Sequence, residues 1–165
     1  MEKEKLYTII IFTENKPGVL YRIADAFLKR KINVESLTVS EIEAQEMSRF
    51  TIRVKGTELA IEKISKQLYK IIEVIKVLEK TDEELIYKEI ALIKVSTKDP
   101  EKRRSVEDIV RLAKAEVVGI ERDFLVVEKS GTEEEINSLY LLLKPFGIKE
   151  YVRSGRIAVL KGGEK

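Results

Sequence analysis

The sequence IIIFTENKPGVL at residues 9–20 decides how the first part of this chain folds. It begins as a continuous run of apolar, largely β-branched residues, which is typical of a buried strand. The run stops at the Asn-Lys-Pro-Gly segment of residues 15–18, a combination that marks a turn. Apolar residues then recur at helical spacing from Val19 onward. The stretch therefore predicts a strand, a tight turn and an amphipathic helix in direct succession.

The turn itself has two interpretations. A helix that begins beside Gly18 leaves its first backbone N–H groups without partners inside the helix, and the positive end of the helix dipole lies behind them. Such a terminus suits a carboxylate, and Asn15 and Asn33 are neutral side chains that could donate or accept hydrogen bonds beside it. The same residues would also serve as an ordinary Pro-Gly connection between two elements. The residues alone leave both interpretations open.

The pattern that follows completes one unit of six elements and then repeats. In the first unit we expect strands at residues 6–12, 34–40, 47–54 and 74–78, and helices at residues 19–30 and 58–71. In the second we expect strands at 88–95, 116–120, 124–128 and 148–152, helices through 106–113 and 136–143, and a short strand at 157–160. Residues 80–85 are charged and lack periodicity, so they are interpreted as the link.

The order strand, helix, strand, strand, helix, strand is typical of one simple fold. Right-handed crossovers turn it into a four-stranded antiparallel sheet with both helices on one face, the ferredoxin-like arrangement. The sequence therefore predicts an α+β protein with two tandem ferredoxin-like (βαββαβ) domains, over residues 1–80 and 81–165. One face of such a sheet has no helix over it, and its outer strands have open edges. Pairing with a second copy would cover them, which makes a symmetric dimer the expected state.

The composition excludes most kinds of enzyme. Histidine and cysteine are both absent from the 165 residues. Their absence removes the Ser-His-Asp and Cys-His arrangements, most zinc sites and the commonest general base. Acidic residues are plentiful, but no pair lies in an apolar setting that would tune it for acid–base chemistry. We therefore expect no catalytic residues, no metal site and no cofactor.

Charge and hydropathy argue against two classes of partner. The net charge of +2 is spread evenly over the two halves, so neither half resembles a module for nucleic acid or anionic membranes. No apolar run is long enough to span a bilayer, and the first five residues, Met-Glu-Lys-Glu-Lys, are no signal peptide. The lack of cysteine fits a reducing compartment. A cytoplasmic protein is expected.

Several segments together resemble a known family. ENKPGVL at 14–20, NVESLTV at 33–39 and SRFTI at 48–52 resemble an ACT domain, and more narrowly that of the regulatory (small) subunit of acetolactate synthase, also called acetohydroxyacid synthase. EIALIKV at 89–95, PFGIKE at 145–150 and RSGR at 153–156 are similar to the carboxyl-terminal domain of the same family. The resemblance covers nearly the whole chain in the right order.

The resemblance implies a non-catalytic subunit. In that family the small subunit activates a separate catalytic (large) subunit that depends on thiamine diphosphate, and confers feedback inhibition by valine or another branched-chain amino acid. The first ACT domain forms the homodimer and binds the effector between protomers. Carried over position by position, the effector-binding residues would be Asn15, Gly18, Val19, Leu20, Asn33 and Val34. The turn would hold the effector's carboxylate on backbone N–H groups, and Val19, Leu20 and Val34 would form an apolar wall.

Two positions depart from the family pattern. Lys31-Ile32 stands where the family usually has Gly-Tyr at the end of the first helix, so the expected glycine cap is absent. Tyr21 replaces a usually small residue in the first turn of that helix, close to the proposed pocket.

Other functions remain as alternatives. A free-standing tandem-ACT amino-acid sensor could control transcription or another enzyme. An RNA-recognition module shares the topology, but it needs stacked aromatics on the third strand, and residues 47–54 offer only Phe50. Arg49 and Arg53 share one strand face and would suit an anion or a solvated surface. The segment Arg153–Arg156 would suit a partner or a tight turn.

Overall fold

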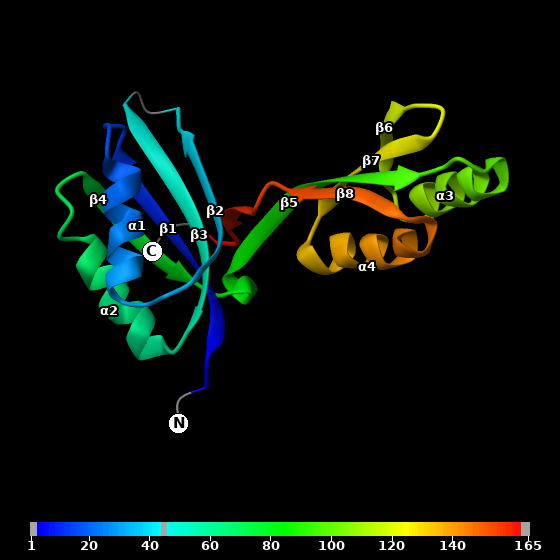
Figure 1. Ribbon diagram of the computed structural model, residues 1–165. Helices are drawn as coiled ribbons and strands as arrows, with labels where there is room; N and C mark the ends of the chain where they lie inside the picture. Colours follow the sequence, from blue (N-terminus) through cyan, green and yellow to red (C-terminus); the bar gives the residue numbers. More distant parts are fainter. Residues whose placement is uncertain (1–2, 44–45, 163–165) are drawn as a thin grey trace. The chain divides into compact units, whose positions relative to one another are not determined.

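The computed structural model describes residues 3–43 and 46–162 (Figure 1). The chain divides into two compact units. The first contains the residues up to Tyr87 together with those from Arg156 onward, and the second contains Lys88–Gly155. No helix in the described ranges is long and apolar enough to cross a lipid bilayer.

The first unit has the predicted order of elements. Its strands are β1 (Lys5–Glu14), β2 (Val34–Glu41), β3 (Met47–Gly56) and β4 (Val74–Lys80), and its helices are α1 (Val19–Lys29) and α2 (Glu58–Leu68). The sheet order is β2-β3-β1-β4 with all neighbours antiparallel. Both helices lie on one face of this sheet (Figure 1). The ferredoxin-like prediction is confirmed.

The core of the first unit lies between the sheet and its two helices. Ile9 and Ile11 alternate along β1 and point to the helix face, because successive side chains of a strand point to opposite faces. They pack against Ile23 and Phe27 of α1. The side chains that complete this cluster are those of Val19, Ala26, Phe50, Ile52, Val54, Ile61, Ile64, Leu68 and Val77.

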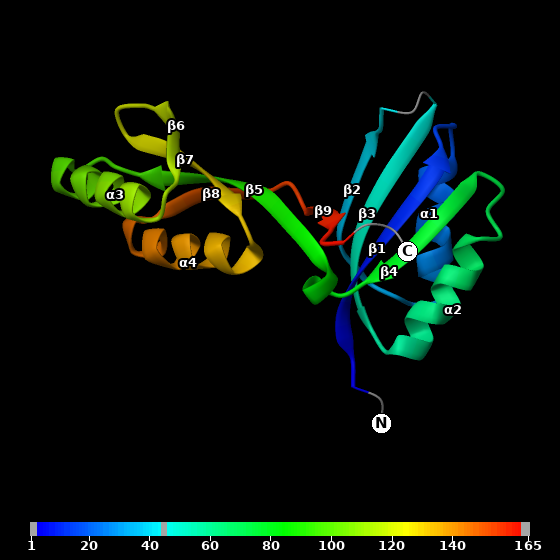
Figure 2. The ribbon, with the colours of Figure 1, turned by 180° about the vertical axis from the view of Figure 1, so that it is seen from behind.

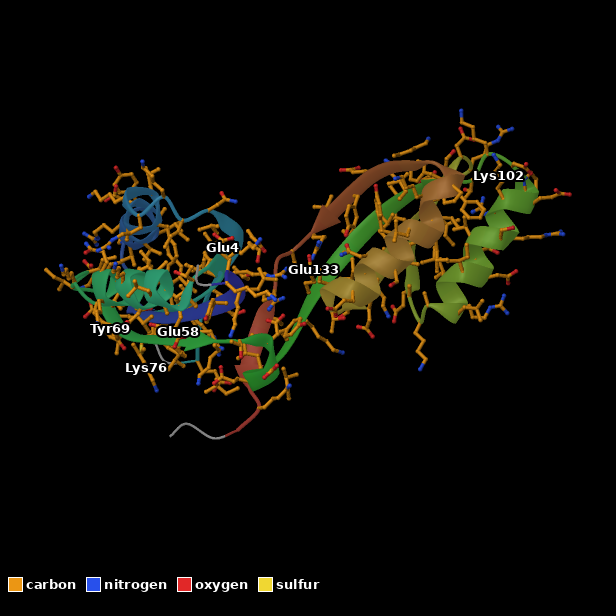
Figure 3. The ribbon with its side chains drawn as sticks, turned by 90° about the horizontal axis from the view of Figure 1, so that it is seen from below. Glu4, Glu58, Tyr69, Lys76, Lys102 and Glu133 are labelled. Carbon is orange, nitrogen blue, oxygen red and sulfur yellow. The ribbon has the colours of Figure 1, made fainter. Side chains whose placement is uncertain are left out.

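Helix α2 ends at Leu68 rather than at residue 71. Tyr69 follows it and its hydroxyl oxygen accepts a hydrogen bond from the N–H of Val77 at 3.0 Å. The same hydroxyl donates to the Val77 carbonyl at 3.3 Å. This contact with β4 ties the segment after the helix to the sheet, and Figure 3 labels Tyr69 at that point.

The other face of the first sheet is covered by the chain itself, which corrects the expectation of an open face. The start of β5 (Leu85–Ser96) pairs with β9 (Ile157–Leu160). Figure 2 shows β9 on the side of the sheet opposite α1 and α2. Ile10 of β1 is fully buried against Leu85 and Ala158. The partly buried members of this cluster are Phe12, Leu78, Tyr87 and Leu160.

The segment 80–85 is structured, so its interpretation as a bare link was incomplete. It contains a short 3₁₀ helix, η1 (Asp82–Glu84), which Thr81 and Glu84 cap reciprocally. Leu85 is 2% exposed and begins the covering layer. The sequence did not reveal this structure, because a single buried residue such as Leu85 produces no periodic pattern. The division at residue 80 stays a prediction about independent domains.

The second unit repeats the topology. Its strands are β5, β6 (Glu116–Ile120), β7 (Phe124–Gly131) and β8 (Ile148–Arg153), in the order β6-β7-β5-β8. Helices α3 (Pro100–Leu112) and α4 (Glu133–Leu143) pack on one face, and η2 (Lys144–Phe146) follows α4. The fully buried core side chains include Ile93, Val95, Val106, Leu125, Val127 and Leu143. The predicted fold class, α+β with two tandem βαββαβ arrangements, is therefore confirmed.

Candidate functional site

Backbone hydrogen bonds, within the turn and to Glu46 before β3, hold the turn between β1 and α1. The N–H of Asn15 donates to the carbonyl of Glu46 at 2.6 Å, and the N–H of Val19 donates to the carbonyl of Lys16 at 3.4 Å. Gly18 has φ 85° and ψ −8°, the left-handed conformation that favours glycine. A Cβ added to Gly18 would meet no heavy atom within 4 Å. The backbone angle, and not lack of space, explains the glycine.

Helix α1 begins differently from the other α-helices of the described chain. Side chains cap α2, α3 and α4, through Thr57, Asp99 and Thr132 respectively. The residue before α1 is Gly18, and no side chain caps that helix. Within the described residues the N–H groups of Gly18, Leu20 and Tyr21 make no hydrogen bond. Three backbone donors, those of Gly18 and Leu20 among them, therefore remain available at the positive end of the helix dipole.

Both cationic side chains of residues 14–22 are already paired. Lys16 forms an ion pair with Glu14, whose hydrogen bond and charge raise the pKa of Lys16 above its ordinary value. Arg22 donates to a carboxylate oxygen of Glu73 at 2.6 Å. An anion at this turn would therefore meet neutral backbone donors more readily than a free cationic side chain.

The other two predicted residues lie at the opposite end of α1. Asn33 is exposed, and Val34 is half-buried opposite Val54 of β3. The 11 residues of α1 separate Gly18 from this position, a length of roughly 16 Å. One copy of the chain therefore does not bring Asn33 and Gly18 together around a single small molecule.

The predicted residues differ in what they expose. Asn15, Gly18 and Leu20 lie at the surface, whereas Val19 is 3% exposed and its side chain packs in the core of the first unit. The side chain of Val19 is therefore not available to an effector, and Val19 can contribute only through its backbone in the first turn of α1. Tyr21, which departs from the family pattern, is 75% exposed and leaves the turn uncovered in this copy.

An apolar edge lies on the first unit and was not predicted. Strand β2 is an outer strand, and its Leu37 and Val39 pair with Ile52 and Phe50 of the core face, yet they are 39% and 44% exposed. Leu20, in the first turn of α1, is also exposed. We call Leu20, Leu37 and Val39 the apolar edge. The alternation of residues 37–39 was visible in the sequence, but the position of β2 at the edge came from the topology.

Two of the arginines for which the sequence left alternatives open, Arg49 and Arg153, have partners. Arg49 donates to the carbonyl of Ala158 and lies over the ring of Phe12. Burial lowers its pKa from the ordinary value. Arg153 pairs with Glu89; burial lowers the pKa of the arginine, but the hydrogen bond and charge of Glu89 outweigh it, so the pKa is raised. Neither side chain is a ready anion site.

Arg156 is 3% exposed and was missed as a structural residue. Arg156 directly precedes β9, and its burial continues the alternation of β9, where Ala158 is buried and Ile157 and Val159 are exposed. Residues 157–160 are all apolar, so this alternation was not visible in the sequence. The described residues also contain no group of three or more metal-ligating side chains that could hold a metal ion.

Comparison with known proteins identifies the family. A model described as the small subunit of acetolactate synthase matches residues 88–162, and a model of the AHAS small subunit-like ACT domain matches residues 9–76. A probable acetolactate synthase small subunit from Archaeoglobus fulgidus is 40% identical over 159 residues, which are 96% of this chain and 99% of that protein. The chain belongs to the acetolactate synthase small-subunit family.

Other members of the small-subunit family agree over the same length. The acetolactate synthase small subunit of Bacillus subtilis is 40% identical over 95% of this chain and 91% of its own. The crystal structure of the acetolactate synthase small subunit from Thermotoga maritima has a TM-score of 0.88 at 31% identity, covering 97% of this chain and 99% of that one. The resemblance stated from the motifs is confirmed, as is the presence of an ACT domain.

Proposed function

We propose that this chain is the non-catalytic regulatory subunit of an acetolactate synthase. It associates with a large catalytic subunit that depends on thiamine diphosphate, and raises the activity of that subunit. It also confers feedback inhibition by valine or another branched-chain amino acid. The membership of the whole chain in the small-subunit family supports the role. The observation that carries the effector site is the uncapped N-terminus of α1 at Gly18.

The turn would recognise the invariant part of an amino acid. The effector's carboxylate accepts hydrogen bonds from the N–H groups of Gly18 and Leu20, where the helix dipole favours a negative charge. Asn15 is exposed beside them and offers an amide that can accept from an ammonium group. The side chains of Leu20 and Val34 provide apolar surface for a branched side chain. The proposed site thus has a polar half, formed by Asn15 and the backbone N–H groups, and an apolar half, formed by Leu20 and Val34.

Two copies would complete the site. Strands β1 and β2 both run antiparallel to β3, so they are parallel to each other. Val34 lies level with Tyr7 at the start of β1, whereas Glu41 lies level with Thr13, next to the turn.

If the β2 strands of two copies pair antiparallel about a two-fold axis, the start of one β2 lies beside the end of the other. That pairing carries Asn33 and Val34 of the second copy to the end of the sheet where Gly18 of the first copy lies. It also buries the apolar edge of both copies. Residues 1–80 would then act as the effector-binding and dimerising domain, and residues 81–165 as the carboxyl-terminal domain of the small subunit.

An activity assay with the cognate catalytic subunit tests the proposal. Acetolactate formation is measured with and without this chain, across separate titrations of valine, leucine and isoleucine. We expect the chain to raise the rate, and at least one amino acid to lower it again. A rate that is the same with and without the chain would contradict the regulatory role. Amino-acid binding without association with the catalytic subunit would instead favour the free-standing sensor.

A further inference from the structure

The carboxyl-terminal segment Arg156–Leu160, which we call the strap, is fixed by a buried arginine. The guanidinium of Arg156 donates to a carboxylate oxygen of Asp82 at 2.5 Å and to the hydroxyl of Thr8 at 3.2 Å. Its Cζ atom lies 3.9 Å from the ring centroid of Tyr87. Thr8 is fully buried. A guanidinium removed from water needs such partners, so they define where the strap can lie.

The backbone of the strap is held on two sides. On one side β9 pairs with β5, and the N–H of Lys161 donates to the carbonyl of Glu84 at 2.9 Å. The carbonyls of Arg156 and Ala158 belong to alternate residues, which point to the same edge of a strand. The hydroxyl of Thr38 donates to the first at 2.9 Å, and the guanidinium of Arg49 donates to the second. Side chains of β2 and β3 thus occupy the free edge of β9.

These contacts connect two parts of the chain. Thr38 is on β2, the outer strand whose start carries Asn33 and Val34. Arg156 follows Gly155, the last residue of the second unit, and that unit lies in sequence between Tyr87 and Arg156. Both ends of the second unit therefore continue into the layer that β2 and β3 hold in place.

We propose that the strap transmits effector binding from β2 to the second unit, with Thr38 and Arg156 as positioning residues. The inference rests on the proposed function, since it takes the effector to bind at the start of β2 and at the turn. An effector that fixes β2 strengthens the docking of the strap, and a docked strap in turn favours the effector, because coupling between two sites is reciprocal. The docked strap is the form that accompanies inhibition.

Hydrogen exchange of the full chain, read on the amides of residues 157–160, tests the coupling. In the wild-type chain we expect saturating valine to slow this exchange about fivefold, the factor that one neutral hydrogen bond contributes. Thr38→Val removes the hydroxyl and keeps the shape of the side chain. It should still bind valine, at most about fivefold more weakly than wild type because the coupling is reciprocal, but valine should no longer slow exchange in the strap.

Two further variants separate coupling from loss of structure. Ser40→Ala removes a hydroxyl two residues along β2, where the described structure has no hydrogen bond to the strap, and should behave like wild type. Arg156→Lys keeps the charge but loses the planar fork, and should speed exchange in the strap without any amino acid. In the complex with the catalytic subunit, Thr38→Val should bind valine and yet be inhibited about fivefold less sensitively.

The outcomes distinguish the two proposals. If valine binds the wild-type chain but leaves exchange at residues 157–160 unchanged, the coupling is wrong and the proposed function stands. The coupling is also wrong if Thr38→Val responds to valine as the wild type does. If valine, leucine and isoleucine all fail to bind the wild-type chain together with its catalytic subunit, the effector site itself is wrong, and the coupling falls with it.

Discussion

Gly18 is the residue on which the effector site depends. Its φ of 85° suits glycine, and a side chain at this position would point into open space. A substitution here therefore strains the backbone by about 1–2 kcal/mol without displacing any neighbour. The charge of the new side chain then decides whether an anion can bind to the adjacent N–H groups.

We predict that Gly18→Asp abolishes effector binding and leaves activation of the catalytic subunit largely intact. The new carboxylate would occupy the anion site and repel the carboxylate of the effector, where one charge-assisted hydrogen bond alone is worth about 1.5–3 kcal/mol. Gly18→Asn is the matched control, because asparagine has the same size, tolerates the left-handed conformation and is neutral. Calorimetry should find no binding to the first variant and weakened binding to the second. Wild-type affinity in Gly18→Asp would mean that the pocket lies elsewhere.

We predict that Asn33→Ala weakens effector binding about fivefold, since a neutral amide contact contributes near 1 kcal/mol. Because Asn33 and Gly18 would meet only across two copies, the variants should complement each other. In an equal mixture of Gly18→Asp and Asn33→Ala chains that exchange subunits, about a quarter of the sites carry neither substitution. Calorimetry of the mixture should recover a class of sites with wild-type affinity. Failure to recover it, with exchange verified, would argue for a site within one copy.

The sequence predicted the turn residues better than it predicted their arrangement. Asn15, Gly18 and Leu20 follow from a Pro-Gly turn that opens a helix, which is a local pattern. The separation of Asn33 from Gly18 by the length of α1 depends on how the helix lies between its two ends. The burial of Val19 agrees with the helical spacing of Val19, Ile23 and Phe27, which predicts a core position and conflicts with the assignment of Val19 to the wall of a pocket. Only the separation of Asn33 from Gly18 is not encoded in the motif.

At the scale of elements, two helices end on lysines where glycine is usual. Lys31 has φ 54° and Lys114 has φ 51°. At the end of α1 the N–H of Lys31 donates to the carbonyl of Leu28, and that of Ile32 to the carbonyl of Phe27, which is the Schellman pattern. The departure from glycine noted in the sequence therefore leaves the shape of the cap unchanged. The cap instead requires Lys31 to adopt the left-handed conformation, which costs free energy in a residue that has a Cβ.

We predict that Lys31→Gly raises the free energy of unfolding by about 1 kcal/mol, because glycine adopts the left-handed conformation without a Cβ penalty. Lys29→Gly is the control, two residues earlier in the last turn of α1. There glycine should lower the free energy of unfolding by about 1 kcal/mol, since it weakens a helix interior. Urea denaturation followed by circular dichroism measures both. A destabilised Lys31→Gly chain would show that the lysine makes a contact worth more than the strain.

The element boundaries show where periodicity suffices. Strands β6 and β9 lie at the predicted residues 116–120 and 157–160, since each is a short apolar run with β-branched residues. The helices gave strong 3.6-residue patterns. Leu85 was missed because it is one buried side chain after a charged stretch, and the contact that buries it comes from β1 and β9. A contact between residues so far apart in sequence leaves no local trace.

At the scale of the whole molecule, the sheet of the first unit has two outer strands, β2 and β4, and β2 is the one that carries the apolar edge. The back of its sheet is covered by β5 and β9, so one of the two reasons first given for a dimer, an open sheet face, does not hold. The other reason, the open edges of the outer strands, still applies to β2 with its apolar edge of Leu20, Leu37 and Val39, since outer strands with exposed apolar side chains favour pairing.

We predict that the chain is a dimer through β2, and that Leu37→Glu combined with Val39→Glu makes it monomeric at micromolar concentration. Burying carboxylates between two copies without partners would oppose association by several kcal/mol. Ile72→Glu is the control, because Ile72 is 94% exposed in the same unit and lies off the edge. Sedimentation velocity should show a dimer for the wild-type chain and for Ile72→Glu. A wild-type monomer, or a dimer that survives both substitutions at the edge, would contradict this interface.

The hydrogen bond between Arg156 and Thr8 joins residues 148 positions apart, and this has a consequence for synthesis on the ribosome. A nascent chain folds from its amino terminus while it grows by about 5–20 residues per second. The sheet and helices of the first unit can form once residue 80 has emerged, but residues 156–160 follow roughly 4–15 s later. During that interval the apolar back of the sheet faces water. Newly made chains would therefore need a chaperone during those seconds more than finished chains do. If translation stalled before residue 156, the released chain would expose the apolar back of its first sheet and would tend to aggregate.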